Sequence, residues 1–213
     1  MEHRGLHENG QLSRHSVDRL EKALGGVLGP VEISNELSQV LAYAAGKETV
    51  SYQEIKEIIK DRTEDVLLLA DEYRLLLPVR TVRGAGWEDR LLLIREGEVY
   101  EMPNIVRSLV REALQTATWN PENAIMELFK EFGDPGWEQI PGLVKSIAEK
   151  ATDHKITGNQ IKKICLQFAL SNRVDGMIAE LKAAGIMSPK LGSIPEVLAA
   201  RSPIYELNPS III

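Results

Sequence analysis

The stretch "GMIAELKAAGIMSP", residues 176–189, and the stretch "SPIYELNPS", residues 202–210, decide the fold of the C-terminal part of this chain. An amphipathic segment runs into Gly185, where the left-handed backbone of a helix end favours glycine. Residues 186–187 then begin an apolar strand, and "PIYELN" returns beside it before Asn208 and Pro209 end the run. The two stretches predict a helix followed by an antiparallel hairpin.

Two shorter helices are expected just upstream of this hairpin. In "ITGNQIKKICLQFAL" the apolar residues recur at helical spacing, and the segment after "SNRV" repeats that pattern. The first stripe is Ile161, Ile164, Cys165 and Phe168, and the second is Val174, Met177, Ile178 and Leu181. A helix from about 142 to 151 precedes both. Matched stripes on two helices joined by a tight turn are typical of a helix-turn-helix.

Residues 33–102 show a comparable order of three helices and then a hairpin. Helices are expected over 33–45, from Ser51 onward and over about 63–73, and Glu54 forms a capping box with Ser51. "RLLLPVRTV" and "RLLLIREGEVYEM" have the composition of strands, and the turn-forming cluster "RGAGWED" joins them.

Residues 104–133 carry two amphipathic helices and no strand pattern, the second capped by Asn120. Their apolar stripes must be buried either against the flanking units or against a second copy of the chain. We expect a homodimer whose interface includes Leu109, Val110, Leu114, Ile125, Leu128 and Phe129. The turn residues "GDPGW", 133–137, then mark a boundary.

The first 32 residues are polar and end in "GGVLGP", which predicts a flexible tail that carries at most one short helix, Ser16–Leu24. The tail holds His3, His7 and His15. Without acidic or cysteine partners at ligand spacing, these histidines indicate a tail and not a metal site.

Residues 141–209 resemble the winged-helix subset of helix-turn-helix proteins, because "ITGNQIKKI", "SNRVDGMIAELKAAGIM" and "YELNP" follow one another in that family's order. A weaker likeness covers residues 33–103. The resemblance implies a mainly α protein with short β-hairpins (α+β), in which two tandem winged-helix units, 33–103 and 134–213, are joined by a helical connector, 104–133. Two departures from the family are the insert "KLGSIPEVLAARS" in the second hairpin and the acidic third helix of the first unit, "TEDVLLLADEYR".

The resemblance further implies that the third helix of a unit lies in the DNA major groove. In the second unit, Ser171, Asn172 and Arg173 would then face bases, while Lys162 and Lys163 would contact phosphates. Residues 151–190 hold six basic residues against three acidic ones, which favours double-stranded DNA as a partner. The alternative is that these residues form an ordinary solvated surface.

The first unit has the opposite charge balance, with nine basic residues against thirteen acidic ones over 46–102. Its third helix is therefore not expected to read bases. Arg80, Arg83 and Arg90 flank "GAGW" and are the DNA-contact candidates on its hairpin, and Trp87 is either an exposed contact or folded back over the hairpin. In the second case the arginines would pair with Glu88 and Asp89.

Whole-chain properties exclude several classes of protein. The formal net charge is −6, which counts against a strong non-specific polyanion binder. Cys165 is the one cysteine, so an intramolecular disulfide is excluded, and its place on an apolar stripe indicates a core thiol. With no export signal and no apolar run long enough to cross a bilayer, we expect a cytoplasmic protein. "AAGKET" lacks the first glycine of a phosphate-binding loop, and no catalytic constellation or cofactor fingerprint is found, so we expect a protein that is not an enzyme and holds no cofactor or metal.

Two functions remain open. The first is a DNA-binding protein, such as a transcription regulator, whose second unit contacts DNA. The second is an assembly scaffold, a use that winged helices also have in chromosome segregation and condensation proteins, and one that an acidic surface suits.

Overall fold

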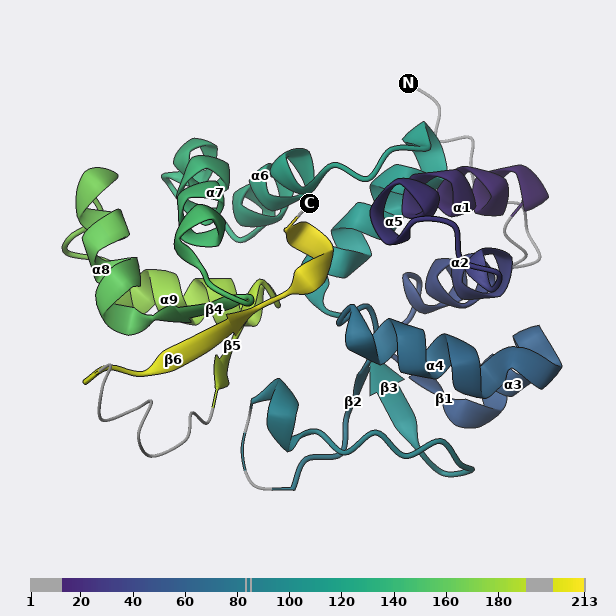
Figure 1. Ribbon diagram of the computed structural model, residues 1–213. Coiled ribbons are helices and arrows are strands. Elements are labelled where there is room, and N and C mark those ends of the chain that lie inside the picture. The colour runs from purple at the N-terminus through teal and green to yellow at the C-terminus, as the bar shows by residue number, and fades with distance from the viewer. Residues whose placement is uncertain (1–12, 83, 85, 191–200, 213) are drawn as a thin grey trace.

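The computed structural model describes residues 13–82, 84, 86–190 and 201–212. Helices dominate, and two small antiparallel sheets lie apart from each other with helices around and between them (Figure 1). The α+β class predicted from the sequence is therefore confirmed.

The first sheet unit is built from residues 34–101. Its elements in order are α2 (Ser34–Ala44), β1 (Thr49–Ser51), α3 (Tyr52–Ile59), the 3₁₀ turn η1 (Lys60–Arg62), α4 (Thr63–Glu72), β2 (Leu77–Pro78) and β3 (Val99–Glu101). The strands form one antiparallel sheet with β3 in the middle, pairing Val50 with Tyr100 and Leu77 with Glu101. The predicted capping box is present at the start of α3, where Ser51 and Glu54 satisfy each other's backbone N–H groups.

The second sheet unit repeats this order over residues 140–207. It contains α7 (Ile140–Lys150), β4 (Lys155–Thr157), α8 (Gly158–Gln167), α9 (Val174–Ala183), β5 (Met187–Lys190) and β6 (Ile204–Leu207). Here β6 is the middle strand, between β4 and β5. The chain leaves α9 through Gly185 at φ 75°, as the sequence predicted. A side chain at this glycine would also collide with Pro103, 2.6 Å from the added Cβ.

The strands differ from the prediction in number and in place. The sequence predicted only hairpin strands, yet each sheet has a third strand, β1 or β4, directly before its second helix. In the first unit, the apolar run 91–94 is not a strand in the sheet; β3 begins at Val99. The backbone N–H of Leu91 donates to the Arg80 carbonyl, next to an isolated antiparallel bridge between Thr81 and Arg90. Leu92 and Ile94 of this run pack partly buried against the core, although the backbone of the run does not join the sheet.

The helix predicted at Ser16–Leu24 is present within a longer one, but where the structure describes this segment it is not a flexible tail. Helix α1 (Arg14–Leu28) begins at a Ser13 cap and packs against α2 and α5 (Asn104–Thr116). Its stripe of Leu20, Ala23 and Leu24 is buried, so this segment is part of the core. Residues 1–12, with His3 and His7, lie outside the described residues.

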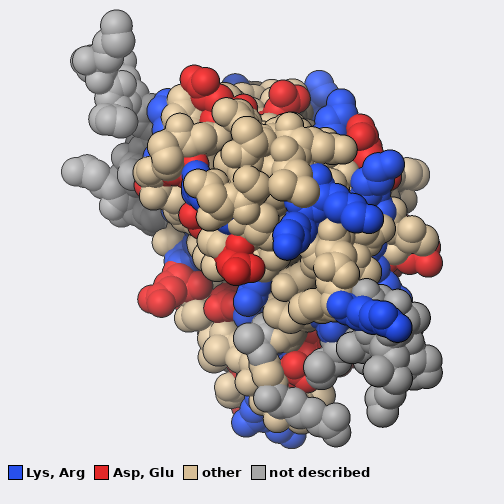
Figure 2. All heavy atoms as spheres, turned by 90° about the vertical axis from the view of Figure 1, so that its left-hand side faces the viewer, with Lys and Arg blue, Asp and Glu red and all other residues tan. Residues whose placement is uncertain are grey.

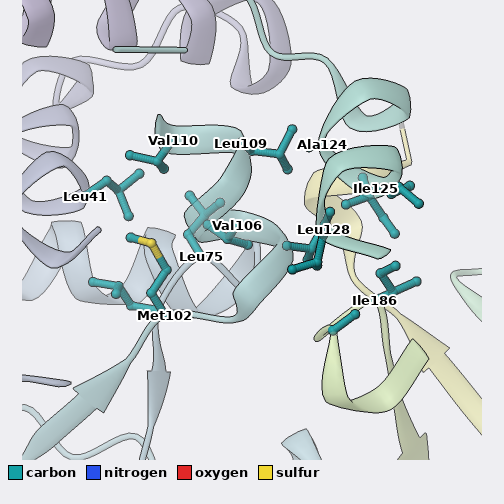
Figure 3. Close-up of a cluster of buried hydrophobic side chains, with 14 of the residues drawn as sticks. Leu41, Leu75, Met102, Val106, Leu109, Val110, Ala124, Ile125, Leu128 and Ile186 are labelled. Atoms are coloured by element: carbon teal, nitrogen blue, oxygen red, sulfur yellow. The ribbon is translucent and has the colours of Figure 1, made fainter. Parts of the chain in front are cut away.

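The predicted dimer interface is also wrong in its placement. Helices α5 and α6 (Pro121–Glu131) lie between the two sheet units, and their apolar stripes fill the space between them (Figure 3). Leu41, Leu75 and Met102 approach α5 from the first unit, while Ile186 of the second unit lies beside α6. The side chains assigned to the dimer, Leu109, Val110, Ile125, Leu128 and Phe129, are buried within one chain, and Leu114 packs partly buried against them. Most of their apolar area is therefore used to join the two units within one chain.

The C-terminal segment returns to this central pair of helices. After β6 the chain forms the 3₁₀ turn η4 (Pro209–Ile211), and the indole N–H of Trp119, in the α5–α6 loop, donates to the Ser210 carbonyl at 2.8 Å. Ile211 is buried at the end of this segment. One continuous apolar cluster therefore includes side chains from α1, both sheet units and the connector.

Candidate functional site

Arg173, the residue predicted to contact bases, is held by two carboxylates. It precedes α9, and its guanidinium pairs with Asp134 at 2.5 Å and with Glu180 at 3.2 Å. The hydrogen bond from Arg173 lowers the pKa of Asp134, whose side chain is almost fully buried, and burial raises the pKa of Glu180. Both terminal nitrogens of Arg173 thus bond carboxylates of the chain, which counts against the predicted base contact.

The turn "GDPGW" places Asp134 at this position. Gly133 adopts φ 74°, and Asp134 Oδ1 accepts the N–H of Gly136 at 2.6 Å before the 3₁₀ turn η3 (Trp137–Gln139) leads into α7. Asp134 therefore connects the end of the α6 segment to the start of α9. Sequence reasoning identified the turn as a boundary but missed this ion pair, since 39 positions separate its partners.

Lys162 and Lys163 are exposed on α8, which a contact with phosphates would require. Neither ammonium group forms an ion pair with any residue that the structure describes. Helix α8 contains no acidic residue, and Leu166, one turn further on, is 55% exposed. Figure 2 views the molecule from the α8 side and shows Lys and Arg side chains gathered across the right half of this face, with fewer acidic groups among them.

Ser171 and Asn172 are also exposed, in the turn between α8 and α9. The outward-facing positions on α9 itself include Gly176, Ala179 and Ala183, with Asp175 near its start. Apart from Lys182, this helix offers no long donor side chain to a groove. Of the five residues predicted to contact DNA in the second unit, four are exposed, and Arg173 is partly buried and paired with carboxylates of the chain.

The arginines predicted on the first hairpin are largely occupied. Arg90 is mostly buried, donates to the Pro78 carbonyl at 2.9 Å and pairs with Glu101 at 2.6 Å. Arg80 is more exposed and pairs with Glu98 at 3.0 Å. Both of these acidic partners lie at or just before strand β3. Arg83 lies outside the described residues.

Trp87 is not the exposed contact that was one of its two predicted placements. It lies in the 3₁₀ turn η2 (Trp87–Asp89), is buried, and its backbone N–H donates to Ser188 Oγ of β5 at 2.9 Å. Gly86 beside it permits this approach, because a Cβ there would lie 2.6 Å from the Pro189 carbonyl oxygen. The hairpin of the first unit therefore packs on a strand of the second.

Ion pairs and hydrogen bonds extend this junction between the units. Arg74, after α4, pairs with Glu206 of β6 at 3.2 Å, and Lys190 of β5 pairs with both Glu206 and Glu88. Asn208 is fully buried and its amide donates to the carbonyls of Arg74 and Gly185, at 3.3 and 3.2 Å. We call these contacts, with Trp87 and Ser188, the wing junction. The sequence carried no local pattern that could have identified it.

The third helix of the first unit, α4, presents acidic residues to solvent. It contains four acidic residues and no Lys or Arg, and Glu64, Asp65 and Glu72 are exposed. Leu68 lies among them at 55% exposure. Sequence reasoning noted the charge but missed Leu68, although it stands outside the buried stripe of Val66, Leu67 and Ala70.

Cys165 is fully buried and burial raises the pKa of its thiol, which confirms the predicted core thiol. Among the described residues there is no cluster of three or more metal-binding side chains, and His15 is exposed alone on α1. Nor does any helix in the described part of the chain have the length and apolar character needed to span a membrane.

Comparison with curated proteins finds no match, and comparison with solved structures finds none. A protein-family model does match, and its match begins within α1 and continues to the last residue. Since this match covers residues 19–213, which is most of the chain, the protein belongs to that family, an uncharacterised one.

Proposed function

We propose that this protein is an assembly scaffold built from two winged-helix units, residues 33–103 and 134–213, joined by the helical connector 104–133. The repeated order helix, strand, helix, helix, strand, strand, with the last strand in the middle of each sheet, supports this interpretation. The fold alone does not specify function, so the choice of a scaffold depends on the surfaces.

The observation that carries the proposal is that neither third helix suits DNA readout. Base recognition requires free donor side chains, such as Arg or Asn, on a helix that can approach two phosphate backbones. Helix α4 would bring Glu64, Asp65 and Glu72 toward phosphates, and like charges repel. At the start of α9, Arg173 is neutralised by Asp134 and Glu180.

The wing junction supports the same function. In winged-helix proteins that bind DNA, the hairpin contacts DNA beside the third helix, but here η2 of the first hairpin packs on β5 of the second. The two units are thereby held in one relative orientation. Two units fixed in this way present the acidic surface of α4 and the basic surface of α8 at separate places, which suits a protein that positions partner chains.

A second candidate function is non-specific contact with DNA through α8. The observation in its favour is the exposure of Lys162 and Lys163 on a helix without acidic residues. Two phosphate contacts yield only a weak, salt-sensitive affinity, since each releases about one condensed counterion.

The test is retention of mixed double-stranded genomic fragments by the intact protein. We expect at most weak binding at about 50 mM salt, without sequence preference and lost by about 200 mM. Lys162→Glu with Lys163→Glu should remove it, whereas the charge-matched control Arg14→Glu with Lys22→Glu, on the exposed face of α1, should not. A sequence-preferring complex that survives about 200 mM salt would overturn the scaffold and support a DNA-binding regulator.

A further inference from the structure

We propose that copies of this chain associate head to tail, with the α4 face of one copy against the α8 face of the next. The α4 face consists of Glu64, Asp65, Leu68 and Glu72, and the α8 face of Lys162, Lys163 and Leu166. This inference rests on the proposed scaffold function and names its partner as a second copy of the chain.

The α4 face is acidic and open. Glu64 and Glu72 form no ion pair with any described residue, and Asp65 lies 3.6 Å from Arg62 in an exposed pair. Leu68 projects among these carboxylates with more than half of its surface in water. Glu64 and Glu72 therefore have no counter-charge among the described residues, and the exposed pair of Asp65 with Arg62 can exchange for a cation of a partner.

The α8 face is basic and, like the α4 face, has an exposed leucine beside its charged residues. Lys162 and Lys163 are exposed and unpaired among the described residues, and Leu166 is exposed to the same extent as Leu68. Single exposed leucines are ordinary on protein surfaces. The charges around these two leucines are what distinguish them, because one leucine stands among acids and the other beside bases.

The two faces also match in spacing. The acidic pair 64–65 precedes Leu68 as the basic pair 162–163 precedes Leu166, at positions i, i+1 and i+4. Four residues advance about 6 Å along a helix, so the charges and the leucine are equally separated on both helices. If α4 and α8 of two copies pack side by side and parallel, the two leucines meet and each acidic pair lies opposite a basic pair.

The contact is heterologous, because each copy contributes a different face. The α4 face belongs to the first unit and the α8 face to the second, and the two helices lie on opposite sides of the molecule (Figure 1). One copy can therefore bind a neighbour at each end, which yields open chains or rings instead of a closed twofold dimer. Exposed ion pairs contribute little each and are screened by salt, so the association is weak and strongest at low ionic strength.

A charge-swap experiment tests the pairing. Glu64→Lys with Asp65→Lys produces a chain with two basic faces, and Lys162→Glu with Lys163→Glu produces a chain with two acidic faces. Each variant should stay monomeric in sedimentation velocity at about 20 mM salt, while wild type at roughly 100 μM should exceed the monomer mass by at least about twofold. A 1:1 mixture of the variants should regain wild-type association, since their faces are complementary again.

The mixture also separates a lost interface from a lost fold, because unfolded variants cannot restore association to each other. The control Arg14→Glu with Lys22→Glu should associate like wild type. A wild-type protein that is monomeric at about 100 μM and 20 mM salt overturns the inference, as does a mixture that stays monomeric. Neither result affects the scaffold proposal, which only sequence-preferring, salt-resistant DNA retention overturns.

Discussion

At the scale of single residues, the ion pair between Arg173 and Asp134 is expected to stabilise the folded chain. Replacing Arg173 with Ala leaves Asp134 buried without its cation, and a broken, largely buried ion pair costs about 3 kcal/mol. We therefore expect Arg173→Ala to lower the free energy of unfolding by about that amount in urea titrations. Lys182→Ala, an exposed change on the same helix, should alter it by less than about 0.5 kcal/mol. An Arg173→Ala protein with the free energy of unfolding of wild type would show that the pair does not stabilise the fold.

At the scale of one element, the Glu54 carboxylate in the capping box of α3 stabilises the fold by an amount that depends on pH. Glu54 accepts hydrogen bonds from Lys47, Tyr43 and Ser51, and chiefly the Lys47 bond lowers the pKa of Glu54 from 4.5 to about 2. Because the folded-state pKa is the lower one, the stabilisation is present above pH 4.5 and is lost as pH falls toward 2.

Glu54→Gln removes this charge while an amide can still serve the capping box. We expect it to cost about 0.5 to 1 kcal/mol at pH 7, with the difference from wild type shrinking below pH 4.5 and vanishing only as pH falls to about 2. Urea unfolding measured across that range is the check. In the uncharged box of α8, where Thr157 pairs with Gln160, Gln160→Ala should cost the same at both pH values. An equal pH dependence in both boxes would contradict the assignment to Glu54.

At the scale of the whole molecule, the apolar cluster is continuous from α1 to the C-terminal turn, and the connector lies at its centre. Leu109 on α5 is fully buried between the units. Leu109→Ala should therefore destabilise the entire chain by about 2 to 5 kcal/mol and not one unit alone. Unfolding followed by tryptophan fluorescence and by far-UV circular dichroism should shift together in one transition.

Val82→Ala, at a side chain that is 64% exposed, is the control and should change stability by less than about 0.5 kcal/mol. Two separate transitions, with only one of them shifted by Leu109→Ala, would mean that the units fold independently.

The sequence by itself determined the helices and the C-terminal hairpin of this protein. The Ser51–Glu54 box, the Asn120 cap, Gly185 and the stripes of α8 and α9 depend on neighbours within a few positions, so their pattern can be recognised without the rest of the chain. Buried Cys165 and the acidic surface of α4 were predicted for the same reason.

Only the tertiary structure decided what those elements contact. Strands β1 and β4 are three residues long and exist because they pair with β3 and β6, each about fifty positions later, so no local pattern marks them. Arg173 has the chemistry of a DNA contact, but its guanidinium donates hydrogen bonds to Asp134, which lies 39 positions earlier in the chain. The apolar stripes of α5 and α6 indicated burial without indicating the partner, since burial of apolar surface is non-directional. Packing of the two units on either side of the connector supplied that partner from within the chain.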